Sequence, residues 1–250
     1  MDPKLVLKIV IFFSFLNSYS IDSVNYYFDS NYSGETKSGL SKKSPFKNLK
    51  KIRTIILKPG DSIFLANGSY FQGNIKLQNK SDIYITNYGS NQKPLPIIDS
   101  KGHIAGIFIE NSSNISVTNL KIIANGGGVL EQYPNLKTSK ITDKAIMRAG
   151  VLINVSDDKI FKNIFINNIS VTDIFYEDEG FVRDASEVKT SMGTQAYGFG
   201  IRFFNSSKNG SIDGIKVSNC FVENVGHTGI KMTSTSLSRF KNIIVSDNKL

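Results

Sequence analysis

The sequence predicts an all-β solenoid whose coils each contain three short strands, and three observations lead to this prediction. The chain has 250 residues, of which 40% are hydrophobic and 20% charged, and this composition supports one sizeable folded core. A segment of similar pattern recurs four times along the chain. Within each copy, apolar and polar residues alternate as they do in strands, without an intervening helical period. Units of this kind bury their apolar faces by stacking on one another.

The first twenty residues differ from the rest of the chain. Lys4 and Lys8 precede an apolar run over residues 9–16, and Ser18 and Ser20 follow it with the spacing of a signal-peptidase site. The run is too short to span a bilayer. We therefore expect residues 1–20 to be a cleaved signal peptide, with a short membrane anchor as the alternative. The mature chain would then be secreted, or exported to the periplasm, with no membrane span.

Residues 21–60 predict an N-terminal segment with an amphipathic capping helix. Ser44 is placed to cap a helix whose first position is Pro45. Apolar residues then recur every three or four positions, as on one face of a helix. They are Phe46, Leu49, Ile52, and Ile55 or Ile56. Such a stripe would cover the open end of a solenoid, which a terminal unit must do to stay soluble.

Residues 61–250 contain the repeat and are predicted to form the solenoid itself. The copies open at Gly106, Gly150, Gly200 and Gly229, and each continues with an alternating strand, a polar turn and a second alternating strand. One inward stack is predicted from the opening strands: Ile107, Val151, Ile201 and Ile230. A second is predicted from the following strands: Ile115, Ile164, Ile215 and Ile243.

The corner before the third strand of each copy carries Asn or Asp, at Asn119, Asn168, Asn219 and Asp247. Asparagine tolerates tight turns, and its amide can bond to the coils above and below, so we expect an internal polar ladder. The last copy stops at Leu250, in or just before a third strand, which would leave an exposed edge. This predicts that further C-terminal coils are missing from the sequence.

The N-terminal half carries a family resemblance. In the segment Tyr26–Leu77, a Ser-Pro-Phe start precedes a Pro-Gly-Asp turn and a strand ending in Gly-x-Tyr. This segment is similar to the start of secreted β-helix enzymes that degrade polysaccharides, and Ser81–Asp99 looks like their next coil. Together with the ladder, the chain resembles a right-handed parallel β-helix of the pectin-lyase-like kind over nearly all of Tyr26–Leu250. The resemblance implies the fold, but lyases, hydrolases, epimerases and non-catalytic adhesins share this framework.

The net charge restricts the class of binding partner, and the cysteine content excludes a disulfide. The net charge is +9, and removing Lys4, Lys8 and Asp2 with the signal peptide leaves +8 on the mature chain. A basic exported protein attracts acidic partners. Because no basic stripe with interleaved aromatic residues is present, we expect an acidic polysaccharide and not nucleic acid, bound by a monomer; lysines that only solvate the surface are the alternative. Cys220 is the single cysteine, so no disulfide forms, and its thiol is predicted to be buried.

The outward position of the opening strands provides the candidate site. It reads Phe108, Leu152, Arg202 and Lys231 in successive copies. Parallel strands lie about 4.8 Å apart, so Arg202 and Lys231 should be neighbours, an arrangement best tolerated when an anion bridges them. We expect this anion to be a carboxylate of the chain or a bound uronate or sulfate. The alternative is that Arg202 and Lys231 are ordinary solvated cations with no bridging anion. His227, in the turn before Lys231, is a candidate for proton transfer near neutral pH, with Glu223 as a nearby carboxylate.

Two insertions, residues 123–149 and 172–199, should form the walls of a groove over this pair, because binding residues are often carried on long loops of a rigid scaffold. The second contains three candidate oxygen ligands for Ca²⁺, which are also candidates for an acid/base pair: Glu177, Asp178 and Glu179. A solvated acidic turn is the alternative. The candidate substrate-binding residues are Tyr176, Tyr197 and Arg183.

Three functions remain open from the sequence. In the first, the protein is a lyase that cleaves an acidic polysaccharide by β-elimination, with Lys231 or His227 taking the proton and Arg202 neutralising the uronate. The resemblance to β-helix lyases implies these roles, although the carboxylate row that binds metal in that family finds no clear match here. The second is a glycoside hydrolase using Glu223 with Asp178 or Asp184. The third is a non-catalytic glycan-binding or surface protein.

Overall fold

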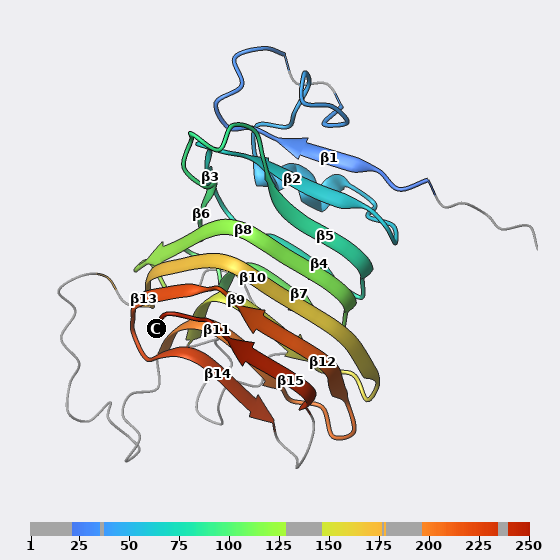
Figure 1. Cartoon of the computed structure of the whole chain (residues 1–250), viewed down its shortest axis with the longest axis vertical. Helices are drawn as coiled ribbons and strands as arrows, with labels where there is room; N and C mark the ends of the chain where they lie inside the picture. The colour runs from blue at the N-terminus through green and yellow to red at the C-terminus, as the bar shows by residue number, and fades with distance from the viewer. Residues whose placement is uncertain (1–21, 36–37, 129–146, 177, 179–196, 235–239) are drawn as a thin grey trace, which may run out of the picture.

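The structure is a computed structural model that describes residues 22–35, 38–128, 147–176, 178, 197–234 and 240–250. Its described part is almost entirely β-structure, and every strand pairing between its named strands is parallel. The strands form two sheets, one of ten strands and one of five. Within each sheet, successive strands stack on one another along the long axis of the molecule (Figure 1). This architecture is consistent with a β-helix-like fold.

The smaller sheet, called sheet B, runs in the order β14-β11-β9-β7-β4. Its strands are β4 (Ile75–Gln78), β7 (Ala105–Glu110), β9 (Met147–Val155), β11 (Tyr197–Asn205) and β14 (Thr228–Ser234). The larger sheet, called sheet A, follows the path β1-β2-β5-β8-β10-β12-β15. Its path strands are β1 (Asn25–Phe28), β2 (Ser62–Ala66), β5 (Ser81–Tyr88), β8 (Ser113–Asn125), β10 (Ile160–Phe175), β12 (Ser211–Ser218) and β15 (Phe240–Ser246). Off this path lie β3 (Tyr70–Gln72), β6 (Ile97–Asp99) and β13 (Phe221–Val225).

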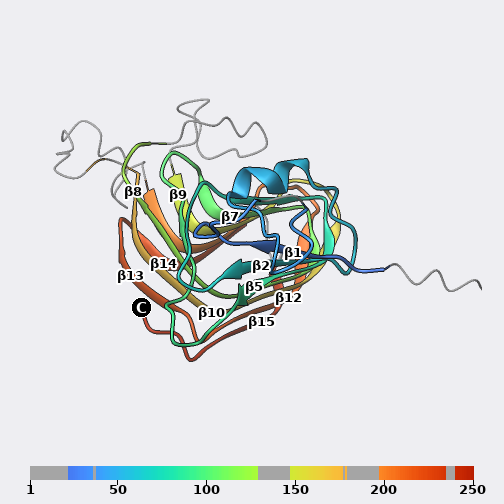
Figure 2. The ribbon, with the colours of Figure 1, turned by 90° about the horizontal axis from the view of Figure 1, so that it is seen from above.

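The chain alternates between the two sheets, so that successive coils superimpose when the stack is seen from above (Figure 2). Among the described residues, the predicted second and third strands are separate in the third copy, as β12 and β13, and in the last copy, where β15 is followed by an isolated bridge at Lys249. In β8 and β10 they run on as one long strand, because Asn119 and Asn168 bend the backbone at φ of 58° and 51° while pairing continues on both sides. The bend, and not a break, makes the corner in these coils. The right-handed sense of the coil stays a prediction.

The interior contains both predicted stacks. Ile107, Val151 and Ile201 are fully buried, and Ile230 packs against them partly buried. Ile115, Ile164 and Ile215 are each 1% exposed, whereas Ile243 on β15 is 43% exposed. The strand register aligns the members of each stack directly, so the repeat alignment was correct.

The opening glycines of the second and third repeats have a packing cause that the sequence did not reveal. A Cβ at Gly150 would lie 2.3 Å from Cγ1 of Val171, and one at Gly200 would lie 2.4 Å from Cγ1 of Val222. Both distances are below any real carbon–carbon contact, and both valines belong to sheet A. Glycine is therefore required at these two positions, where a side chain of sheet A comes close to the backbone of sheet B.

The asparagine ladder is on the surface and not inside the protein. The Asn168 amide donates to Oδ1 of Asn119 at 2.8 Å, as predicted, but the Asn219 amide donates to Asn167 at 2.8 Å instead. Asn168 and Asn219 are exposed, which contradicts an internal ladder. The left-handed backbone places these side chains on the outer corner, where neighbouring coils can still bond to each other.

The N-terminal helix differs from its prediction. It is a 3-10 helix, η1 (Leu49–Thr54), and Asn48 precedes it in an extended conformation without a side-chain cap. The helix does not begin at Ser44 because the Phe46 backbone bonds to β1 instead, donating to Tyr27 at 2.8 Å. Its apolar side is nevertheless buried, with Leu49 at 1% and Ile52 at 5% exposure. η1 lies against β4, the end strand of sheet B; its capping role stays a prediction.

Several further expectations concern the whole chain. The predicted signal peptide, residues 1–20, lies outside the described residues. Within the described ranges, no helix has both the length and the apolar character needed to cross a bilayer.

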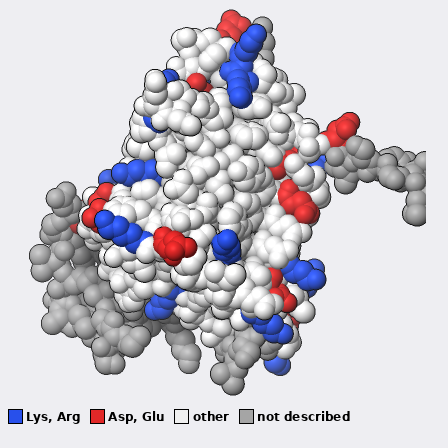
Figure 3. All heavy atoms as spheres, in the orientation of Figure 1, with Lys and Arg blue, Asp and Glu red and all other residues white. Residues whose placement is uncertain are grey.

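Cys220 is 2% exposed, and burial raises the pKa of its thiol, in agreement with the predicted buried cysteine. On the face seen in Figure 3, acidic and basic side chains are interspersed and form no continuous basic stripe.

Candidate functional site

The two cations predicted as neighbours do lie on adjacent strands of sheet B. Arg202 on β11 is the direct cross-strand partner of Lys231 on β14. The same row continues through Leu152 on β9 to Phe108 on β7. The alternation of each strand places this row on the outer face of sheet B, opposite the isoleucine stack.

Arg202 is buried, however, and not solvated as an outward position would suggest. Its side chain is 8% exposed, and the guanidinium carbon lies 4.2 Å from the ring centroid of Phe199 and 5.1 Å from that of Phe204. Lys231 is partly buried, with Nζ 5.6 Å from the Phe199 centroid. Aromatic rings attract cations through their quadrupoles, so Phe199 partly offsets the cost of holding two positive charges together.

His227 joins this pair on the same aromatic ring. Its backbone N–H donates to the carbonyl oxygen of Gly198 at 2.7 Å, which positions the turn against β11. The imidazole is partly buried, lies 5.1 Å from the Phe199 centroid, and bonds through Nδ1 to the Thr228 hydroxyl. We call Arg202, Lys231 and His227, arranged around Phe199, the basic cluster.

Burial and mutual repulsion shift the pKa values of two members toward the neutral form. Burial lowers the pKa of His227, and the charges of Lys231 and Arg202 lower it further. Burial also lowers the pKa of Lys231, with Arg202 as the second cause. A guanidinium does not lose its proton in proteins, so Arg202 stays charged. The cluster thus combines one permanent cation with two bases that are easier to deprotonate than usual.

The outer face of sheet B also carries a second apolar cluster, separate from the interior core. Its buried members are Ile104, Ala105, Phe108, Met147, Ala149, Leu152, Phe199 and Phe204. The face beside the basic cluster is therefore largely apolar. Such surroundings strengthen the electrostatic effect of a charged group, because water does not screen it.

A buried carboxylate on this face escaped the sequence analysis. Glu110, the last residue of β7, is 3% exposed and accepts hydrogen bonds from Gln78 Nε2 at 2.7 Å and Asn154 Nδ2 at 2.8 Å. Gln78, Glu110 and Asn154 occupy the same register position on β4, β7 and β9. The signal was present in the repeats, since each of the three directly follows an apolar strand residue.

A buried arginine was also missed. Arg148 on β9 has 0% exposure, and its guanidinium donates to backbone carbonyl oxygens of His103 at 3.0 Å, Phe175 at 2.7 Å, Gly126 and Gly128. The carbonyls of Gly126, Gly128 and Phe175 lie where the described chain leaves β8 and β10 for the two insertions, and His103 lies just before β7. Arg148 therefore ties together the bases of both insertions.

The predicted calcium ligands are described only in part. Asp178 accepts a hydrogen bond from the Gly127 backbone N–H at 2.8 Å and lies 3.9 Å from Lys101 Nζ. Glu177 and Glu179 lie outside the described residues. Among the described residues, no three His, Cys, Asp or Glu side chains form a group able to hold a metal ion.

The remaining predicted residues are scattered or outside the described part. Glu223 is exposed on β13 in sheet A, where it lines a hollow of about 350 Å³ with Lys249 and Leu250. Tyr176 is partly buried beyond the end of β10, and Tyr197 begins β11. The last three predictions fall on residues that are not described: Arg183, Asp184 and most of both insertions.

Comparisons with known proteins bear on the fold. No protein-family model matches the chain, and no curated protein matches it. A crystal structure of a GH136 lacto-N-biosidase from Eubacterium ramulus matches 90% of this chain at a TM-score of 0.63 and 20% identity. The chain spans 40% of the length of that structure. A rhamnogalacturonan lyase structure matches 90% of this chain and 66% of its own at a TM-score of 0.37 and 16% identity. At 20% identity, the first likeness shows a shared fold.

Proposed function

We propose that this protein is an exported carbohydrate-active enzyme that cleaves an acidic polysaccharide by β-elimination at the basic cluster. The observation that carries the proposal is the pairing of Arg202, which is always charged, with Lys231, whose pKa is lowered. A fixed cation next to a base of reduced proton affinity is the arrangement that proton abstraction beside a carboxylate needs.

The reaction follows from these groups. Arg202 pairs with the carboxylate of a uronate and withdraws electron density from it. Lys231 or His227 removes the proton from the carbon next to that carboxylate. The electron pair of the broken C–H bond forms a carbon–carbon double bond as the glycosidic C–O bond breaks. The departing oxygen takes up a proton, so one chain becomes two, and the new non-reducing end is unsaturated.

The direction of the pKa shifts suits this role. A base must be neutral before it accepts a proton, and burial next to Arg202 increases the neutral fraction of Lys231. As negative charge grows on the uronate carboxylate in the transition state, the nearby lysine binds a proton more strongly. Lys231 therefore becomes a better acceptor as the reaction proceeds.

A glycoside hydrolase on the same face is the second candidate. Two observations favour it: the fold is shared with a lacto-N-biosidase, and Glu110 provides a buried carboxylate on the outer face of sheet B. Hydrolysis uses a pair of carboxylates on either side of the scissile bond, so this candidate needs a second carboxylate beside Glu110. A non-catalytic glycan-binding role is the third candidate.

One assay distinguishes the three candidates. The protein is incubated with uronic-acid glycans and sulfated glycans, with and without a calcium chelator. Both the ultraviolet absorbance of unsaturated uronate and the number of new reducing ends are measured. A lyase produces both signals together. Reducing ends without the unsaturated product would replace the lyase with the hydrolase, and no product on any glycan would leave a binding role. Loss of activity with chelator would support the calcium prediction.

A further inference from the structure

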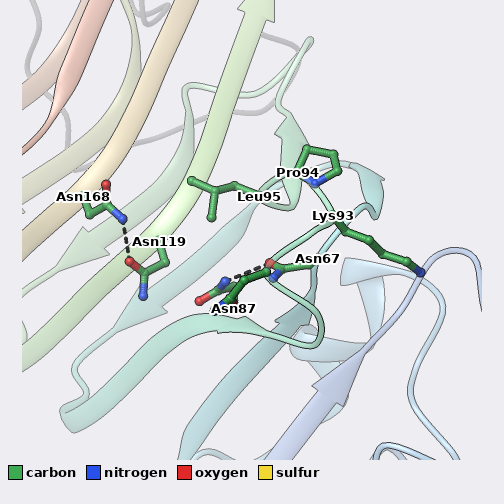
Figure 4. A pocket seen from close by; sticks show the side chains of 8 residues that line it. Asn67, Asn87, Lys93, Pro94, Leu95, Asn119 and Asn168 are labelled. Atoms are coloured by element: carbon green, nitrogen blue, oxygen red, sulfur yellow. Dashed lines mark hydrogen bonds between the residues drawn. The ribbon is translucent and has the colours of Figure 1, made fainter.

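A second pocket lies on the outer corner of sheet A, on a different sheet from the basic cluster (Figure 4). Its volume is about 500 Å³, within the range of small-ligand sites. Its polar lining consists of Asn67, Asn87, Asn91, Asn119, Asn168 and Lys93. We call it the asparagine pocket.

The pocket forms where β8 exchanges one neighbouring strand for another. The pairing of β5 with β8 ends at Ile85 and Val117, and the later part of β8 pairs with β6 instead. β5 continues without a left-handed bend, while β8 turns at Asn119, where φ is 58°. The two coils therefore separate at this corner, and the pocket occupies the gap.

The asparagine ladder is split at the same place. By its position after Thr86, Asn87 is the next rung below Asn119, but its amide donates to Asn67 Oδ1 at 2.8 Å. Asn119 instead donates to the Thr86 hydroxyl at 3.2 Å and accepts from Asn168 at 2.8 Å. Figure 4 shows the resulting two pairs, Asn67–Asn87 and Asn119–Asn168, with Leu95 projecting between them.

The side-chain amides that line the pocket are held in fixed orientations and still have unused hydrogen-bonding groups. Asn67 is 5% exposed and donates to the carbonyl oxygen of Ser90 at 3.0 Å, so its plane is set by bonds on both sides. Each carboxamide has two N–H donors and two lone pairs on its oxygen, and the bonds of Asn67, Asn87 and Asn168 use only part of this set. Groups held in place before binding lose little freedom when a ligand arrives.

The lining chemistry selects the class of ligand. Carboxamides donate and accept together, which matches the vicinal hydroxyls of a sugar, and Leu95 and Pro94 offer apolar contact for the C–H groups of its ring. No carboxylate is among the described residues that line the pocket, so the lining lacks the anionic oxygen ligands that divalent-cation sites usually contain. A single lysine is a weak basis for selecting a polyanion. We propose that the asparagine pocket binds a neutral sugar residue of a glycan, as a non-catalytic holding site that does not depend on the basic cluster.

The test is a titration of Asn side-chain amide signals by NMR, using ¹⁵N-labelled full chain. The protein is produced without attached glycans, since Asn67-Gly-Ser and Asn168-Ile-Ser are acceptor sequences for glycosylation. The probes are neutral tetrasaccharides of glucose, mannose and N-acetylglucosamine, with trigalacturonate as the acidic comparison. We expect at least one neutral probe to shift the signals of Asn87, Asn91, Asn119 and Asn168.

Two variants make the titration specific. Asn91→Ala removes one exposed lining amide, and we expect the affinity for the neutral probe to fall about threefold to tenfold. Gln92→Ala changes the next residue of the same exposed turn, which does not line the pocket, and should leave the affinity unchanged. Unshifted pocket amides with every neutral probe, a response to trigalacturonate alone, or equal effects of the two variants would each overturn the proposal. Arg202→Ala should leave this binding intact, because Arg202 and the asparagine pocket lie on different sheets. The result of this titration is therefore independent of the result of the lyase assay.

Discussion

The two faces of sheet B are formed by alternate residues of the same strands but bury different chemistry. Ile201 is fully buried among the aliphatic residues of the core, while its neighbour Arg202 is 8% exposed on the outer face against aromatic rings. The inner row keeps a β-branched aliphatic residue, Ile or Val, from coil to coil. The outer row changes from Phe108 and Leu152 to two cations. The coil requires an apolar interior at every level, whereas its outer face is free to vary, and function is expected where it varies.

The largest effect should come from placing a charge on the inner face. Ile201→Asp buries a carboxylate without a partner, and we expect it to lower the free energy of unfolding by several kcal/mol, measured by chemical denaturation. Ile244→Asp is the matched control, because Ile244 is 55% exposed on β15, and it should change stability little. If Ile201→Asp retained full stability, the two-face description of sheet B would be wrong.

The next effect concerns chemistry on the outer face. Lys231→Ala should abolish turnover of an acidic glycan while leaving measurable binding, because it removes the proposed base and keeps Arg202. Turnover is followed by unsaturated product, and binding by calorimetry. Turnover in Lys231→Ala near the wild-type rate would assign the proton transfer to another group, with His227 tested next.

Arg202→Ala should weaken binding of an acidic oligosaccharide by about tenfold or more, since a hydrogen bond to a charged group contributes about 1.5–3 kcal/mol. It also removes a charge that lowers the pKa of Lys231, so the rising limb of the pH–rate profile should move to higher pH. Arg202→Lys retains the charge and should preserve that limb. Equal loss of affinity for neutral glycans would indicate damage to packing over Phe199.

The smallest effect should appear in the pH dependence of stability. The pKa of His227 is lowered in the folded state from an ordinary value of about 6.5, so the unfolded chain binds the proton more readily. The contribution of His227 to the free energy of unfolding is therefore complete above about pH 6.5. It is lost as the pH falls through the lower pKa of the folded state. Thermal unfolding of His227→Gln should show less acid destabilisation than wild type. An identical pH dependence would show that His227 titrates normally.

The sequence predicted the parts of the fold that repeat. The isoleucine positions, the corner asparagines and the pairing of Arg202 with Lys231 follow from aligning four copies, because parallel stacking turns equivalent positions into neighbours. The prediction was wrong where local signals competed with tertiary pairing. Ser44 and Pro45 are typical of a helix start, but backbone bonds between Phe46 and β1 hold that segment extended.

What the sequence by itself determined is the identity of the stacked side chains, since a fixed strand period assigns every residue to the inside or the outside. Only the tertiary structure decided how exposed those side chains are and where the stacking stops. Arg202 occupies an outward position yet is buried against Phe199 and Phe204, two aromatic residues of its own strand. The asparagine pocket exists because β8 changes its pairing partner from β5 to β6. Such a change depends on the geometry of two neighbouring coils together, which no single repeat encodes.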